Sequence, residues 1–410
     1  MKTSINLNKF VRIPVLSALV FMILYNVSFK SIEILTTGRI AVILLILWAL
    51  IIKKNFLGPL RYNISFLLIF LPLPYVVAQY FLVADFGQLS RFLNLWLYSF
   101  IGASLIASLC KNIKCLIIIF LIAINIQSAI IFISFFSDSY RYWVEASIVS
   151  SSNYGADYIY RASGFSGSGG AALSLIQSLG VFFGWLLLRK NGAYENIKGK
   201  YANLVFAGMI LSGASCILVG RTGTILSIVF LLIFIFESQH RLKFSIFAIG
   251  AVMLLNFLFF EILIISLDNN FSSEYFTKWA FGIFTGQDET IRTLDEQPIP
   301  PLSVETFFGT GLSSVVSEAN PSGNDSGFVQ AYYSMGLIFA LIFFSAYICV
   351  LYFSLNWLPG FLRIVISAML FLIEIKEPFV FKYSLLFIVL TLYFVHCPFH
   401  FNKRSKRILA

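Results

Sequence analysis

The sequence predicts an all-α polytopic membrane protein with about twelve transmembrane helices and long loops on one side of the membrane. Of its 410 residues, 59% are hydrophobic and only 12% are charged, and the mean hydropathy is +0.87. A soluble protein carries about a quarter charged residues, and a disordered chain contains few aromatic residues, whereas this chain has 45 phenylalanines. A water-soluble globule and a disordered chain are therefore both excluded.

About twelve apolar segments are long enough to cross roughly 30 Å of hydrocarbon as helices. They span residues 13–29, 36–52, 63–84, 89–110, 114–136, 169–188, 201–219, 223–237, 244–267, 326–355, 358–374 and 380–397. Runs such as residues 40–52 lack the alternation of apolar and polar residues that is typical of barrel strands. We expect one membrane domain that covers residues 1–410.

The positive charges indicate the orientation of the chain. If both termini are cytoplasmic, most of the 29 Lys and Arg residues fall in short inner segments, and most of the 19 acidic residues fall outside. The net charge of +10 is then a topology signal with affinity for anionic membrane lipids, and it does not indicate a nucleic-acid partner. No small-residue cleavage site follows the first apolar segment, so we expect an uncleaved anchor.

Two outer loops are long, residues 137–168 and residues 268–325, and this asymmetry predicts polar chemistry on the outer face. The five cysteines lie in or beside apolar segments, so their spacing indicates neither a disulfide framework nor a metal site.

The first outer loop ends in an Arg/Gly-rich stretch from Arg161 to Gly170, which includes Gly164 and leads into an apolar segment. Glycines let the backbone approach a ligand closely, and the helix that follows starts at the outer face with free N–H groups. Together with Arg161, these features predict an anion site. The alternative is a flexible hinge with Arg161 reaching the lipid headgroups.

A second element repeats this pattern at Gly220-Arg221-Thr222-Gly223, between two apolar segments. The turn is so short that Arg221 is expected at the outer ends of both helices, at the N-terminus of the second one. An interface anchor in a tight glycine turn is the alternative. Arg91 occupies a similar outer position, for which ligand binding and anchoring are equally open, whereas anchoring is favoured for Arg39.

The second outer loop is acidic and contains several candidate proton acceptors. Residues 271–284 place aromatics at helical spacing, which predicts an amphipathic helix on the membrane surface or a packed lid. Asp325 precedes the next apolar segment, where it is expected as a helix N-cap and also as a fixed carboxylate that accepts a proton. Glu305 and Glu318 are alternative acceptors.

Other ionisable groups have separate interpretations. Glu261 is a functional candidate because a carboxylate within an apolar span is costly. Residues 374–382 form a charged turn in which Glu374, Glu377 and Lys382 are expected to pair with neighbouring charges of opposite sign.

This arrangement resembles the bacterial O-antigen polymerases (Wzy type), which are related to the O-antigen ligases. The resemblance rests on the number of spans, the late outer loop, the stretch from Arg161 to Gly170, the Gly220-Arg221-Thr222-Gly223 turn and the Asn324-Asp325-Ser326-Gly327-Phe328 segment. It implies an inner-membrane glycosyltransferase that joins undecaprenyl-diphosphate-linked oligosaccharide units at the periplasmic face. It also implies that a flippase and a chain-length regulator work with the enzyme.

In such a reaction, Arg161, Arg221 and Arg91, with the backbone at Gly164, would bind the diphosphate, and Asp325 would accept the proton of the acceptor hydroxyl. Arg161 and Arg221 would also stabilise the departing charge, so that neither a metal nor a cofactor is required. The related ligases use a His in the long outer loop, and this chain has none there, which favours a polymerase. A lipid-linked oligosaccharide flippase or another transporter is the main alternative.

Overall fold

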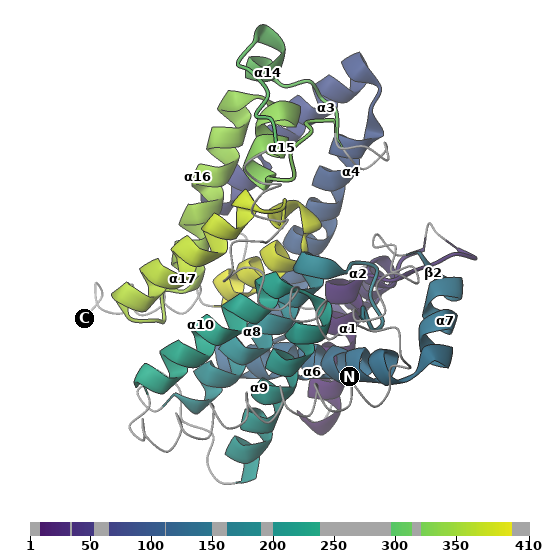
Figure 1. Ribbon diagram of the computed structural model, residues 1–410, viewed down its shortest axis with the longest axis vertical. Coiled ribbons are helices and arrows are strands. Elements are labelled where there is room, and N and C mark those ends of the chain that lie inside the picture. Colours follow the sequence, from purple (N-terminus) through teal and green to yellow (C-terminus); the bar gives the residue numbers. More distant parts are fainter. Residues whose placement is uncertain are drawn as a thin grey trace, which may run out of the picture. The chain divides into compact units, whose positions relative to one another are not determined.

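The computed structural model describes residues 9–32, 35–52, 65–110, 112–149, 162–189, 200–237, 297–313 and 321–395, which are mostly helical (Figure 1). The structure divides into two compact units, and the predicted single membrane domain stays a prediction. Unit 1 comprises Met1–Asn26, Ile34–Ile119 and Glu296–Ala410, and unit 2 comprises Val27–Glu33 and Phe120–Asp295. The predicted span at 244–267, which contains Glu261, and the predicted amphipathic helix at 271–284 lie outside the described residues.

Five described helices are long and apolar enough to cross a membrane: Phe86–Leu109, Ile113–Phe136, Gly170–Leu188, Tyr201–Val219 and Leu337–Ser354. Five shorter apolar helices accompany them: Arg12–Tyr25, Thr37–Ile51, Leu68–Val83, Arg221–Ile233 and Ser384–Val395. The predicted class, a helical membrane protein, agrees with this structure. The total of twelve spans and the sidedness of the loops stay predictions.

The first half of unit 1 runs from the N-terminus to the start of α6 (Ile113–Phe136), which crosses into unit 2. Its elements are α1 (Lys9–Tyr25), α2 (Thr37–Ile51), η2 (Ser65–Phe70), α3 (Pro72–Val83), α4 (Phe86–Asn94), the π-helical segment η3 (Leu95–Gly102) and α5 (Ala103–Leu109). Thr36 caps α2 by accepting a hydrogen bond from the Arg39 N–H, and Asp85 caps α4 by accepting one from the Gly87 N–H.

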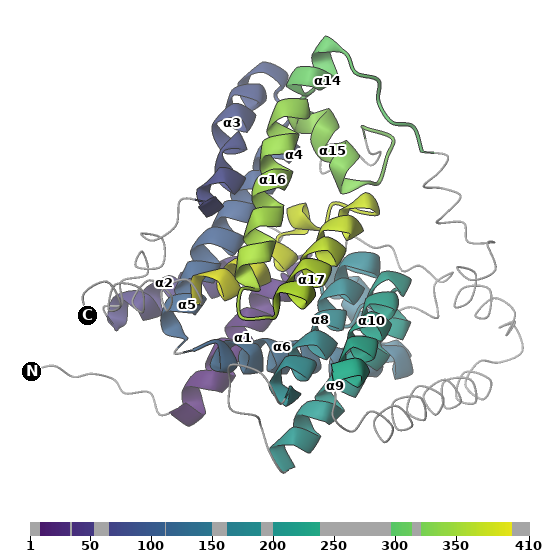
Figure 2. The same ribbon diagram turned by 90° about the vertical axis from the view of Figure 1, so that its left-hand side faces the viewer.

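The second half of unit 1 contains α14 (Val304–Phe308), α15 (Gly327–Met335), α16 (Leu337–Ser354), α17 (Gly360–Leu372), the turns η5 (Ile373–Ile375) and η6 (Val380–Lys382), and the helix Ser384–Val395. Helix α14 contacts both α15 and α16 near the point where they join, and α3 packs beside α4 and α16 (Figure 2).

The segment predicted as a span at 326–355 forms two helices, because the helix is interrupted at Gly336. Gly336 has a φ of 85°, and its ideal Cβ would lie 2.5 Å from the carbonyl carbon of Phe308. The loop after α14 bonds to the end of α15 there, with the Thr310 N–H donating to Tyr333 O at 2.9 Å and the Gly311 N–H donating to Ser334 O at 3.0 Å. The loop thus satisfies carbonyls that a continuous helix would have used itself.

Unit 2 contains a helical bundle and a small cap. The bundle is made of α6, α8 (Gly170–Leu188), α9 (Lys200–Val219) and α10 (Arg221–Glu237), with α8 in contact with both α9 and α10 (Figure 1). The cap includes β1 (Ser28–Phe29), α7 (Asp138–Ser147) and β2 (Ile148–Val149), and the two strands pair antiparallel. The predicted outer loop at 137–168 therefore begins with a helix and a short strand.

Small residues bring the bundle helices close together, as is usual between helices in membranes. An ideal Cβ on Gly180 would lie 2.5 Å from Ser212 Oγ, and one on Gly184 would lie 2.9 Å from Met209 Cβ. The interior also holds a buried polar group in which Ser128 Oγ and Ser215 Oγ both donate to Gln177 Oε1, at 2.7 and 3.2 Å. These contacts fix α8 rigidly against α6 and α9.

Candidate functional site

The two Arg/Gly elements that the sequence singles out are brought together in unit 2. The Ala162 N–H donates to the carbonyl oxygen of Leu218 at 3.0 Å, and Leu218 lies two residues before Gly220. Gly220 in turn packs on the start of α8, because an ideal Cβ on it would lie 3.0 Å from Gly170 O. The loop at residues 162–169 and the turn at Gly220 therefore lie at the same end of the bundle. Arg161 itself lies outside the described residues.

Gly164 shows why this loop requires glycine. Its φ is +60°, which disfavours residues with a side chain, and an ideal Cβ would lie 2.8 Å from Gln127 Nε2 and 2.9 Å from Ile131 Cγ1. Gln127 Nε2 also donates to the Ser163 carbonyl oxygen at 2.9 Å. The loop backbone is thus pressed against α6 and held there by a buried hydrogen bond.

Helices α8 and α10 begin side by side and run parallel. Gly220 contacts Gly170, and Gly223 contacts Ser174. Further along, the ring centroids of Phe230 and Phe182 lie 5.1 Å apart. The contacts therefore follow the same chain direction in both helices. The positive dipole ends of both helices therefore meet at one place. Arg221 is the first residue of α10 and is half-buried there. This arrangement, which we call the paired N-termini (the starts of α8 and α10 with loop 162–169), suits an anion.

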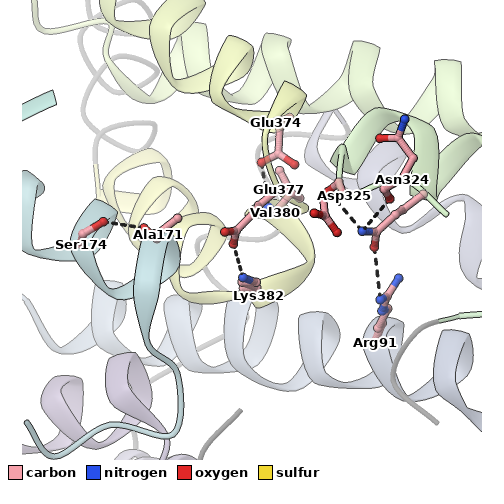
Figure 3. Close-up of polar contacts among 10 residues, drawn as sticks. Arg91, Ala171, Ser174, Asn324, Asp325, Glu374, Glu377, Val380 and Lys382 are labelled. Carbon is pink, nitrogen blue, oxygen red and sulfur yellow. Dashed lines mark hydrogen bonds and ion pairs between the residues drawn. The ribbon is translucent and has the colours of Figure 1, made fainter. Parts of the chain in front are cut away.

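In unit 1, a chain of hydrogen bonds links Arg91 to the Asp325 segment (Figure 3). Arg91 Nη2 donates to Gln330 Oε1 at 3.5 Å, and Gln330 Nε2 donates to the carbonyl oxygens of Asp325 and Asn324 at 3.1 and 3.3 Å. The Arg91 guanidinium also lies 5.9 Å from the ring centroid of Phe381. Sequence reasoning selected Arg91 and Asp325 but missed Gln330, which connects them.

Asp325 does not cap α15, contrary to the sequence prediction. The N-cap position belongs to Ser326, and the exposed Asp325 carboxylate accepts a hydrogen bond from Gln297 Nε2 at 2.9 Å. Its backbone N–H donates to Gln297 Oε1, also at 2.9 Å. Gln297 thus holds Asp325 at two points while the carboxylate stays exposed to solvent.

Glu374 is a buried carboxyl that sequence reasoning placed in a charged surface turn. It is 0% exposed; Oε1 accepts the Val380 N–H at 2.8 Å, and Oε2 has no hydrogen-bond partner. An ideal Cβ on Gly327 would lie 2.5 Å from Oε2, so the carboxyl packs against the start of α15, two residues after Asp325. The predicted pairing holds for Glu377, whose Oε2 lies 2.5 Å from Lys382 Nζ, but it is wrong for Glu374.

The protonation of Glu374 follows from this burial. Glu374 lies in η5, beyond the end of α17, and burial raises the pKa of its carboxyl well above the ordinary value. A carboxyl whose pKa is higher in the folded protein than in the unfolded chain contributes to the free energy of unfolding. This contribution is complete at pH values below the ordinary pKa, and it is lost as the pH rises through the folded-state pKa.

We therefore expect the melting temperature of the wild type to fall as the pH rises above the ordinary carboxyl pKa, and that of Glu374→Gln to fall less. The amide of Gln can still accept the Val380 N–H but carries no titrating proton. Thermal unfolding of the purified proteins in detergent, measured from acid to alkaline pH, tests this expectation. Glu305→Gln, which changes an exposed carboxyl in α14, is the matched control. Equal pH dependence in Glu374→Gln and in the wild type would contradict it.

The remaining candidates are less connected to these sites. Glu305 is exposed in the first turn of α14, which is tied to α15 by a 2.9 Å hydrogen bond between Tyr332 Oη and Thr306 Oγ1. Glu318 lies outside the described residues. Within the described ranges, no group of three or more His, Cys, Asp or Glu side chains is placed to hold a metal ion.

A second residue missed by sequence reasoning is Gln88, one helical turn before Arg91 in α4. It is 2% exposed, and neither atom of its side-chain amide has a hydrogen-bond partner. A buried amide without partners is costly. Gln88 therefore adds an unsatisfied polar group to the interior of the protein, one helical turn from Arg91.

Comparison with protein-family models, with curated proteins and with solved structures finds no match to this chain.

Proposed function

We propose that this protein is an O-antigen or polysaccharide polymerase: a glycosyltransferase that joins undecaprenyl-diphosphate-linked oligosaccharide units at the periplasmic face of the bacterial inner membrane. The observation that carries the proposal is the paired N-termini in unit 2. Two parallel helices begin together beside a glycine loop, with Arg221 at the first position of α10. This is the environment that a diphosphate attached to a membrane lipid requires.

The paired N-termini contribute most as the bond to the diphosphate breaks. The anomeric carbon of the donor sugar leaves the phosphate oxygen, and the bonding electrons stay with the lipid diphosphate, whose negative charge increases. Arg221 and the positive dipole ends of α8 and α10 are fixed before the reaction, so they stabilise this charge without reorganisation. Arg161, next to Ala162 in sequence, is assigned to the same anion by its position in the chain.

The Asp325 site supplies the proton acceptor. As the acceptor hydroxyl oxygen bonds to the anomeric carbon, its proton passes to the Asp325 carboxylate, which later releases it to water. Gln297 fixes the carboxylate, and Gln330 links the same segment to Arg91. Arg91 is assigned to diphosphate binding, as its sequence position indicates.

Asp325→Asn is expected to lower polymerisation by about 10²-fold or more while the protein stays folded. The Asn oxygen can still accept from Gln297 Nε2, so the local geometry is kept and only the proton acceptor is lost. Chain-length ladders on polysaccharide gels, from a deletion strain complemented with each variant, measure this effect. Glu305→Gln is the control; loss of the ladder in that variant, with a normal ladder in Asp325→Asn, would assign the acceptor to Glu305 instead.

The same gels test the class of protein. A deletion strain that carries single repeat units on the lipid A core, and recovers a ladder on complementation, indicates a polymerase. Loss of all polysaccharide, single units included, would indicate a ligase. Lipid-linked units that accumulate on the inner face would indicate a flippase.

A further inference from the structure

The small cap of unit 2 carries a group of partly buried aromatic side chains beside an exposed tryptophan. Val27, Val144 and Ile148 form the core of the cap, and Phe29, Tyr140 and Phe165 pack against that core. The cap is also held by backbone contacts, since the Lys30 N–H donates to Ser147 O at 2.9 Å beside the pairing of β1 with β2. The aromatic rings are therefore mounted on an ordered support.

We call Phe29, Tyr140, Trp143 and Phe165 the aromatic platform. The rings of Trp143 and Phe165 are nearly parallel, with an interplanar angle of 10° and centroids 6.3 Å apart. Tyr140 lies 5.7 Å from Trp143, and Phe29 lies 6.2 Å from Phe165, measured between ring centroids. Trp143 is 47% exposed, which is high for a large aromatic residue that already packs against two others.

The groups around the platform suit a sugar. Sugar rings present C–H groups that pack on aromatic faces and hydroxyls that bond to carboxylates at the edges. The exposed Asp138 and Glu145 share one face of α7 with Tyr142, which is 71% exposed, and Trp143 lies on the neighbouring exposed side of the same helix.

The position of the platform supplies the second argument. Phe165 directly follows Gly164 in loop 162–169, which is part of the paired N-termini. In a lipid-linked oligosaccharide, the first sugars directly follow the diphosphate. A ligand whose diphosphate lies at the paired N-termini therefore has its sugars within reach of the platform.

We propose that the aromatic platform binds a sugar ring of the lipid-linked oligosaccharide, with Trp143 as the principal contact; this inference rests on the proposed function. It assigns recognition of the oligosaccharide to α7 and the 162–169 loop, separately from the diphosphate contacts of Arg221. Trp143 is then a specificity residue that acts on binding, and the chemical step does not depend on it.

The test uses the full-length protein in nanodiscs, with the lipid-linked repeat unit isolated from the deletion strain as substrate. Trp143→Ala is expected to raise KM roughly tenfold with little change in kcat, and Trp143→Phe is expected to lie between it and the wild type. Trp96→Ala, which removes another partly exposed tryptophan in η3, should leave both constants unchanged. If Trp143→Ala has an unchanged KM in the same assay in which Arg221→Ala is inactive, sugar binding by the aromatic platform is contradicted. The proposed function would not be affected by that result.

A second measurement does not depend on activity. The tryptophan fluorescence of the wild type and of Trp143→Phe is compared in nanodiscs of phosphatidylcholine with and without brominated acyl chains. If the platform faces solvent, the Trp143 contribution is not quenched by bromine. Strong quenching of that contribution would show that the platform contacts lipid and would overturn the proposal.

Discussion

Replacing Gly223 by alanine is expected to disrupt the paired N-termini more severely than a Gly→Ala substitution at any other described glycine. An ideal Cβ on Gly223 would lie 2.0 Å from the carbonyl oxygen of Ser174 and 2.3 Å from its carbonyl carbon. These are backbone atoms of a buried helix, so no side-chain rotation relieves the overlap. Helices α8 and α10 must move apart, and the 3.1 Å bond from the Gly223 N–H to Ser174 Oγ is strained or lost.

Overpacking of this kind costs typically 1–3 kcal/mol and sometimes more, and here it falls directly on the proposed anion site. We expect Gly223→Ala to show a clearly lower melting temperature in detergent and no polymer ladder in cells. The matched control is Gly360→Ala, at the first residue of α17, where an ideal Cβ meets no heavy atom within 4 Å. A Gly223→Ala protein as stable as Gly360→Ala would contradict the close contact between α8 and α10.

Replacing Arg221 by alanine is expected to reduce polymerisation by about 10²- to 10³-fold without unfolding the protein, because one preorganised donor to the departing charge is removed. Arg221 begins α10 and is only half-buried, so its loss leaves the bundle interior intact. Arg221→Lys keeps the positive charge but cannot form bidentate hydrogen bonds to phosphate oxygens, so it is expected to retain partial activity.

The control for this prediction is Arg189→Ala, which removes a half-buried arginine at the opposite end of the same bundle, at the C-cap of α8. There the guanidinium lies 5.6 Å from the ring centroid of Trp185 and away from the paired N-termini. Chain-length ladders are compared at equal protein levels in the membrane. Equal ladders from Arg221→Ala and Arg189→Ala would remove Arg221 from the mechanism.

Several helices of this protein were predictable, because their apolar runs are long compared with the flanking segments. The segment predicted at 169–188 is α8 at Gly170–Leu188, and the segment at 114–136 is α6 at Ile113–Phe136. The break at Gly336 was not predictable from local sequence. It depends on a loop more than twenty residues earlier, in which Gly309 and Gly311 bring the backbone against the end of α15.

The candidate sites were predictable as separate motifs but not as assemblies. Glycine with arginine at a helix start is a local pattern, so Gly164 and Arg221 were found independently, whereas the bond from Ala162 to Leu218 that brings their segments together is a tertiary contact. Glu374 shows the opposite case. Its charged neighbours suggested a solvated turn, but its burial depends on the position of α15, which the local sequence does not encode.

The most direct test of the account is the binding of undecaprenyl diphosphate to the purified protein in nanodiscs. The wild type is predicted to bind the diphosphate more tightly than undecaprenyl monophosphate, with an affinity that falls as salt rises. Arg221→Ala is predicted to lose this preference, and Arg189→Ala to keep it. Equal affinity of the wild type and Arg221→Ala for the diphosphate would contradict the claim that the paired N-termini form a diphosphate site.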